Sequence, residues 1–107
     1  MTRAWLRPRA EDDLVERVGY YRAQGGSELA ERFVDATIAG LRAAERLPNA
    51  GSPLVGELCD IPGLRAWRVR RFPVRWYSFV TEDRLDIVRL LADAQDLIAV
   101  FGDDGAD

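Results

Sequence analysis

Residues 64–91, LRAWRVRRFPVRWYSFVTEDRLDIVRLL, decide the fold because their side chains alternate with a period of two. Three runs rich in valine, isoleucine and aromatic residues lie at 65–71, 74–80 and 85–91, and short polar or proline-containing segments separate them. Runs of this length between turn residues are typical of β-strands. The stretch therefore predicts three strands joined as an antiparallel meander.

The same alternation assigns the side chains of the meander to two faces. One parity is apolar enough to pack against helices. Its members are Trp67, Val69, Tyr77, Phe79, Val88 and Leu90. The opposite parity mixes arginines with Trp76, Ser78 and Ile87, so we expect it to form a surface that a partner contacts.

Upstream of the meander the hydrophobic spacing is helical. Apolar side chains recur three and four residues apart over residues 8–24 and again over residues 27–47, and Gly25-Gly26 favours a turn between them. These patterns predict two antiparallel helices preceded by a strand at residues 3–6. We also expect a short strand between the loops at 48–53 and 60–63, and a short C-terminal helix at 93–101.

Together these elements predict one α+β domain over residues 1–101, with a helix hairpin packed on an antiparallel β-sheet and a short C-terminal helix. Residues 102–107 are expected to be a disordered acidic tail. No apolar run is long enough to cross a bilayer, and arginines interrupt the first ten residues where a signal peptide would be apolar. We expect a cytoplasmic protein with no membrane contact.

The amino-acid composition excludes several kinds of catalytic and metal-binding site. The chain has no histidine and a single cysteine, Cys59, which excludes Cys/His zinc sites, Ser-His-Asp triads and Cys-His pairs. Cys59 is expected to be a packed side chain rather than a reactive thiol. Any general base would have to be a carboxylate, and we expect no catalytic residue, metal or cofactor.

Charge is distributed unevenly along the chain. Five arginines and no acid lie between Arg65 and Trp76, whereas the chain as a whole carries −3 and the segment after Leu91 has five aspartates and no basic residue. A nucleic-acid-binding protein is commonly basic overall, whereas this chain has a net negative charge and an acidic C-terminal segment. We therefore do not expect direct nucleic-acid binding. The arginines could instead form a binding surface or a solvated strand face, and Arg75 and Arg89 could form internal ion pairs with Asp86, Asp93 or Asp96.

The order of elements and a series of short motifs resemble the ParE toxins of the RelE/ParE superfamily. The resemblance spans residues 3–101. The motifs are Pro8-x-Ala10-x-x-Asp13-Leu14, Tyr20-Tyr21, Ala30-x-x-Phe33, Leu47-Pro48-x-x-Gly51, Gly63-Leu64-Arg65, Val69-x-x-Phe72-Pro73, Tyr77 and Ile87-Val88-Arg89-Leu90-Leu91.

This resemblance implies a toxin of a bacterial type II toxin-antitoxin system, neutralised by a ParD-like antitoxin and inhibiting DNA gyrase by binding. Two alternatives stay open. One is ribosome-dependent mRNA cleavage, as in the related RelE branch. The other is a non-toxic binding module, because this chain has Ala92-Asp93-Ala94-Gln95-Asp96 where ParE-like sequences commonly have a His-x-x-Arg-Asp type segment.

Two surfaces are predicted to bind these partners. A basic sheet face would contact the target or the antitoxin, and it comprises Arg65, Arg68, Arg70, Arg71, Arg75, Trp76 and Arg89. An apolar groove along the helices would receive an antitoxin helix. Its members are Leu14, Val15, Val18, Tyr20, Tyr21 and Val34.

Overall fold

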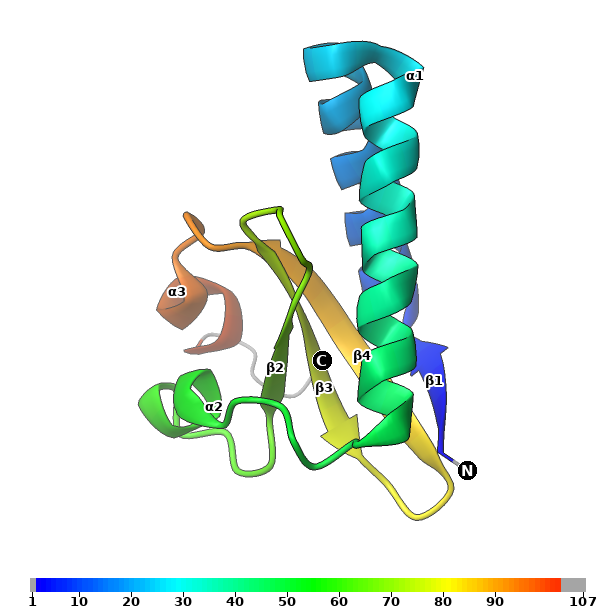
Figure 1. The fold of residues 1–107 in the computed structure, drawn as a ribbon. Coiled ribbons are helices and arrows are strands. Elements are labelled where there is room, and N and C mark those ends of the chain that lie inside the picture. Colours follow the sequence, from blue (N-terminus) through cyan, green and yellow to red (C-terminus); the bar gives the residue numbers. More distant parts are fainter. Residues whose placement is uncertain (1, 103–107) are drawn as a thin grey trace.

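The computed structural model of the protein describes residues 2–102. A four-stranded sheet carries a long helical hairpin on one face and two short helices on the other (Figure 1). The elements in chain order are β1 (Arg3–Leu6), α1 (Pro8–Arg46), α2 (Leu54–Leu58), β2 (Arg65–Arg68), β3 (Val74–Val80), β4 (Arg84–Ala92) and α3 (Leu97–Gly102). Within residues 2–102, no helix is both long and apolar enough to cross a membrane.

The predicted helix hairpin is α1, whose two arms are separated by a break at Gly25 and Gly26. Gly26 has a φ of +78° and a ψ of −171°, a conformation that side chains disfavour. At this point the chain reverses and the second arm runs back beside the first (Figure 1). Pro8 occupies the first turn, where its missing N–H costs nothing.

The sheet has the strand order β1-β4-β3-β2. The pairs β2–β3 and β3–β4 are antiparallel, which confirms the meander. The sequence-based expectation of a wholly antiparallel sheet is incomplete, because β1 pairs with β4 in parallel and makes the sheet mixed. The helical hairpin between β1 and the meander provides the long crossover that a parallel pair requires.

Both faces of the sheet are covered, and this corrects the predicted parities. Trp76 and Ile87 pack in the core beneath α1, whereas Tyr77 and Val88 belong to a second core under α2 and α3. A register shift between Tyr77 and Ser78 changes the alternation in the middle of the sheet. Such a bulge places an extra residue on one strand, so simple alternation fails beyond it.

Three other boundaries differ from the predictions. Residues 54–58 form the helix α2 rather than a strand, and β2 ends at Arg68 because residues 69–73 form the turn into β3. The C-terminal helix begins at Leu97, after a turn that starts at Ala92. Of the predicted tail, Gly102 ends α3, and residues 103–107 lie outside the described part of the chain.

Candidate functional site: an arginine turn beside a helical hairpin

Of the arginines in the predicted basic face, those that are exposed lie at the turn between β2 and β3. We call Arg68, Arg70 and Arg71 the arginine turn. Within residues 2–102, none of these three guanidinium groups has a carboxylate at ion-pair distance. The turn therefore concentrates three unneutralised positive charges within four residues.

The backbone of the arginine turn is held in place. The Val69 N–H donates to the Val74 carbonyl oxygen at 3.0 Å, and the Phe72 N–H donates to the Val69 carbonyl oxygen at 3.1 Å. Arg71 has a φ of +74°, a left-handed conformation uncommon for a side-chain-bearing residue. The Phe72 ring lies 5.0 Å, between ring centroids, from both Tyr21 and Phe33 of the hairpin. The turn is thus anchored against α1 with its arginines directed into solvent.

Two further arginines of the predicted basic face interact with the protein itself. The Arg65 Nη1 donates to the Gly51 carbonyl oxygen at 3.1 Å. The Arg75 Nε lies 3.3 Å from the Asp93 Oδ1, which confirms the internal ion pair considered for Arg75. Arg75 stands directly opposite Arg68 across β2 and β3. Asp93 therefore offsets the repulsion that these like charges would otherwise exert.

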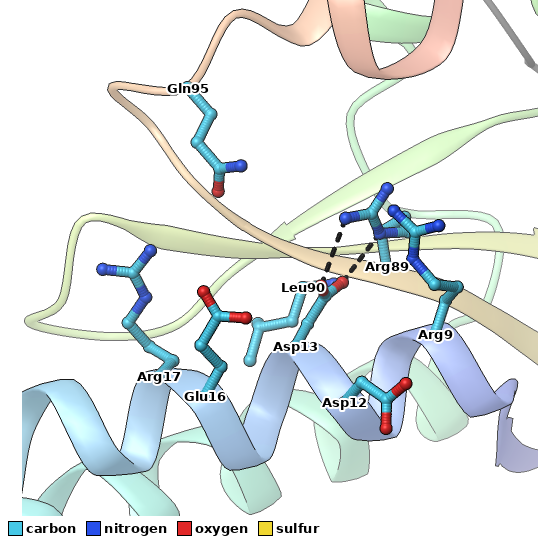
Figure 2. A pocket seen from close by; sticks show the side chains of 8 residues that line it. All are labelled: Arg9, Asp12, Asp13, Glu16, Arg17, Arg89, Leu90 and Gln95. Carbon is cyan, nitrogen blue, oxygen red and sulfur yellow. Dashed lines mark hydrogen bonds and ion pairs between the residues drawn. The ribbon is translucent and has the colours of Figure 1, made fainter.

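Arg89 is also engaged, with a partner that sequence reasoning missed. Its Nε lies 2.8 Å from the Asp13 Oδ2 and its Nη2 lies 3.1 Å from the Asp13 Oδ1, as Figure 2 shows. The Leu90 N–H donates to the same carboxylate at 3.0 Å. Only about 15% of each charged side chain is exposed. The pair therefore holds the first arm of α1 against β4, instead of presenting a free cation to a partner.

The Arg89–Asp13 pair lies in a pocket of about 320 Å³ between the first arm and the segment after β4 (Figure 2). The charged residues around it balance: three arginines and three carboxylates line the pocket. Gln95 borders it, and the Gln95 Oε1 accepts a hydrogen bond from the Ala92 N–H at 2.8 Å. The segment 92–96 thus forms a turn stabilised by its own side chain.

Trp76 is not part of any surface, so its prediction as a binding residue is wrong. Its exposed fraction is 0%, and the indole Nε1 donates to the Thr37 carbonyl oxygen at 3.0 Å. The prediction fails because both faces of the sheet are covered: Trp76 packs with Val74 beneath α1, and Tyr77 packs on the opposite face.

The predicted apolar groove is divided by the structure. Val18 and Val34 line a groove of about 370 Å³ between the two arms, together with the polar side chains Arg22, Glu31 and Asp35; we call it the hairpin groove. Leu14 and Tyr21 do not line this groove and, like Val18, they pack against the core beneath α1. Val15 is 73% exposed and Tyr20 is also exposed, but neither lines the hairpin groove.

Tyr21 and Tyr77 are not prepared for proton transfer near neutral pH. Burial raises the pKa of Tyr21 above its ordinary value of 10, although the nearby Arg17 partly offsets this effect. Burial also raises the pKa of Tyr77, which lies 5.1 Å, between ring centroids, from Phe101. In the described part of the chain, no group of three or more acidic, cysteine or histidine residues could hold a metal ion.

Sequence reasoning also missed Trp5, which is 54% exposed on β1. The Arg84 Cζ lies 4.7 Å from the centroid of the Trp5 ring, a cation–π arrangement. The exposure of Trp5 could have been predicted from strand alternation, because Trp5 lies between Ala4 and Leu6. In the structure Ala4 and Leu6 pack against the core beneath α1.

Neither protein-family models nor curated proteins match this chain. Among solved structures, the chain is similar to one from a chromosomal ParDE TA system of P. aeruginosa, with a TM-score of 0.74 and 22% identity. The alignment covers 86% of this chain and 96% of that chain. This similarity confirms the predicted α+β fold of ParE type.

Proposed function

We propose that this protein is the toxin of a type II toxin-antitoxin system and that an antitoxin of ParD type neutralises it. The observation that carries the proposal is the ParE-like fold, which aligns over 86% of this chain with a chain from a ParDE system. The match includes nearly all of that chain, so it is not limited to a common substructure.

The hairpin groove and the arginine turn are the surfaces proposed for the antitoxin. An amphipathic helix could place apolar side chains against Val18 and Val34, because the groove between the two arms already exposes them. The arginine turn would pair with acidic residues that follow this helix. The contact of Phe72 with Tyr21 supports one continuous interface, because it places the turn beside the hairpin.

We further propose that the protein acts on DNA gyrase by binding rather than by catalysis. The arrangement of charged groups favours this choice over ribonuclease activity. Arg75 and Arg89 each face an aspartate, so neither is available to stabilise a developing charge on a scissile phosphate. The raised pKa of Tyr21 and of Tyr77 likewise opposes their use as general bases at neutral pH.

Expression of the protein in a bacterial host tests the proposal. We expect growth arrest, relief of that arrest by the short reading frame adjacent to its gene, and loss of gyrase supercoiling activity with purified protein. Growth arrest with intact supercoiling and with mRNA cleavage on ribosomes would replace gyrase inhibition by the RelE-like activity. Normal growth at full expression would favour a non-toxic binding module.

The proposed antitoxin surface is tested by R70Q/R71Q, with R32Q/R46Q as a control that removes the same charge from exposed positions of α1. Removing hydrogen-bonded, desolvated arginines costs about 2–5 kcal/mol, so we expect antitoxin binding at least tenfold weaker. The control should bind within twofold of the parent in isothermal titration calorimetry. Equal binding by all three proteins would exclude the arginine turn from the interface.

A further inference from the structure

Within residues 2–102, one side of the strand β1 is not covered by another strand. It is the terminal strand in the order β1-β4-β3-β2, and its Arg7 N–H donates toward β4, to the Ile87 carbonyl oxygen at 2.9 Å. Because backbone groups alternate in direction along a strand, the N–H and C=O groups of Ala4 and Leu6 face away from β4. The Ala4 N–H confirms this direction, since it donates to the Glu45 Oε2 of α1 at 2.7 Å.

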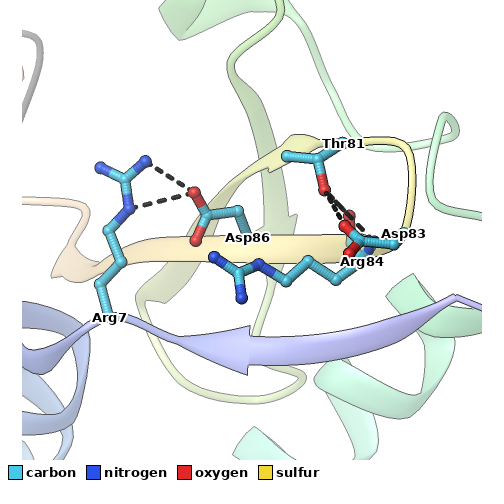
Figure 3. A network of polar contacts seen from close by, with 5 residues as sticks. All are labelled: Arg7, Thr81, Asp83, Arg84 and Asp86. Carbon is cyan, nitrogen blue, oxygen red and sulfur yellow. Dashed lines mark hydrogen bonds and ion pairs between the residues drawn. The ribbon is translucent and has the colours of Figure 1, made fainter.

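Contacts with β4 fix the position of this edge in the absence of a partner. At the end of β1, the Arg7 guanidinium contacts the Asp86 Oδ2 of β4 through its Nε at 3.1 Å and its Nη2 at 2.6 Å (Figure 3). The four residues of β1 are in register with residues 84–87 of β4. A partner would therefore meet a preformed template and would not have to order it.

A groove of about 350 Å³ runs between β1 and the second arm of α1. Leu6 and Leu41 form its apolar floor, and Ile38, which is 45% exposed, forms part of its wall. Side chains on one face of an added strand would enter this groove, because Ala4 and Leu6 point to the same side of the sheet.

The positive charge around the edge favours a partner with acidic side chains. Arg3 and Arg42 line the groove, and within residues 2–102 neither has a carboxylate at ion-pair distance, whereas the single acid in the lining, Glu45, contacts the Ala4 N–H. Pairing of β1 with β1 of a second copy would add a strand that carries Arg3 and no acid to an edge that already has Arg3 and Arg42. Like charges on neighbouring strands destabilise such pairing, so the edge disfavours self-association.

We propose that the open edge of β1 binds an extended segment of a partner protein as a fifth strand of the sheet. Apolar side chains at alternate positions of that segment fill the groove beside Ile38 and Leu41. Acidic side chains face Arg3 and Arg42, and a backbone carbonyl of the segment takes the Ala4 N–H from Glu45. This interaction is separate from the hairpin groove and does not depend on the toxin proposal.

Selection from a displayed library of random octapeptides tests the proposal. The full chain is the bait, and the variant A4P, which lacks the edge N–H, is the counter-bait. Proline is tolerated at such a position because its nitrogen faces away from the neighbouring strand. We expect an enriched pool that alternates apolar and acidic residues and that A4P does not retain. A pool retained equally by folded A4P, or no enrichment, would overturn the proposal.

Methylated peptides give a test that does not depend on folding of the variant. In the most enriched peptide, alternate amides are N-methylated in two complementary sets. One set faces β1 and should weaken binding at least tenfold, whereas the other should change it less than twofold. The protein's backbone NMR shifts should move at residues 3–6 and 38–45. Equal effects of both sets, or shifts confined to the hairpin groove, would contradict strand addition.

Substitutions that change the charge of the groove test whether acidic side chains of the segment contribute to binding. R42E should weaken binding of the enriched peptide at least tenfold, and E45Q, which keeps a side chain of similar size, should not weaken it. Unchanged binding by R42E would show that charge does not select the partner.

Discussion

Arg89 and the arginine turn belong to the same stretch of basic, β-rich sequence, yet the protein uses them in opposite ways. Arg89 is mostly buried and its guanidinium group contacts both oxygens of Asp13. Arg70 and Arg71 are exposed in the turn after β2, and neither has an ion-pair partner in the described chain. The charge of Arg89 is neutralised in an ion pair that holds α1 to the sheet, whereas the charges of the arginine turn remain available to a partner.

A cluster of arginines in a sequence therefore cannot be assigned as a binding surface until the carboxylate partner of each arginine is located. Asp13 comes from α1 and reaches Arg89 across 76 residues of sequence. Arg75 is an intermediate case, because Asp93 pairs with it at a more exposed position. Removing the counter-charges one at a time should therefore produce graded effects on stability.

The largest effect is expected from D13A, which leaves Arg89 nearly buried without its partner and leaves the Leu90 N–H without its acceptor. Breaking such a pair costs about 3–5 kcal/mol in the free energy of unfolding. Urea denaturation followed by circular dichroism measures this change. The control is D12A at the adjacent exposed position, which should stay within about 0.5 kcal/mol of the parent. Equal stability of D13A and D12A would show that the pair does not hold α1 to the sheet.

A smaller effect is expected from G26A, which disturbs the same region through the backbone. Gly26 adopts a φ of +78° and a ψ of −171° where the arms of α1 reverse, a region essentially restricted to glycine, so a side chain there costs about 1–3 kcal/mol. The matched control is G19A, because nothing lies within 4 Å of a Cβ at Gly19 in the first arm. Alanine is the better helix former at that position, so thermal unfolding should show G19A at least as stable as the parent.

The substitution D93N is expected to cost at most about 1 kcal/mol, because Arg75 and Asp93 are both partly exposed. The loss should shrink as salt is added, since salt already screens the pair in the parent protein. Urea titrations at low and high sodium chloride measure both quantities. A loss of stability as large as that of D13A, and independent of salt, would show that the Arg75–Asp93 pair stabilises the fold as strongly as the Arg89–Asp13 pair.

The smallest effect on stability is expected from R68Q/R70Q/R71Q. These side chains have no ion pair in the described chain, so the free energy of unfolding should change by about 0.5 kcal/mol or less. Relief of repulsion between Arg68 and Arg75 could make the change slightly favourable. Destabilisation above 2 kcal/mol in urea titrations would show that the arginine turn is structural and remove the basis of the comparison.

The elements that could be predicted from the sequence are those that depend on neighbouring residues. Alternation located β3 at residues 74–80, and the start of β1 and the reversal at Gly25-Gly26 were also predicted correctly. The arginine turn was visible as well, because its charge is a property of composition. Such features follow from local backbone preference and from side-chain spacing within a few residues.

Contacts between distant segments depend on the folded structure. In it, β1 pairs with β4 in parallel, Arg89 contacts Asp13, and Trp76 is buried beneath α1. Each of these outcomes depends on contacts between residues far apart in the chain, and both faces of the meander are apolar enough to be buried. The alternation of one strand cannot choose between two such faces. That choice is made when the helices pack, because only then does one face exclude water against α1 and the other against α2 and α3.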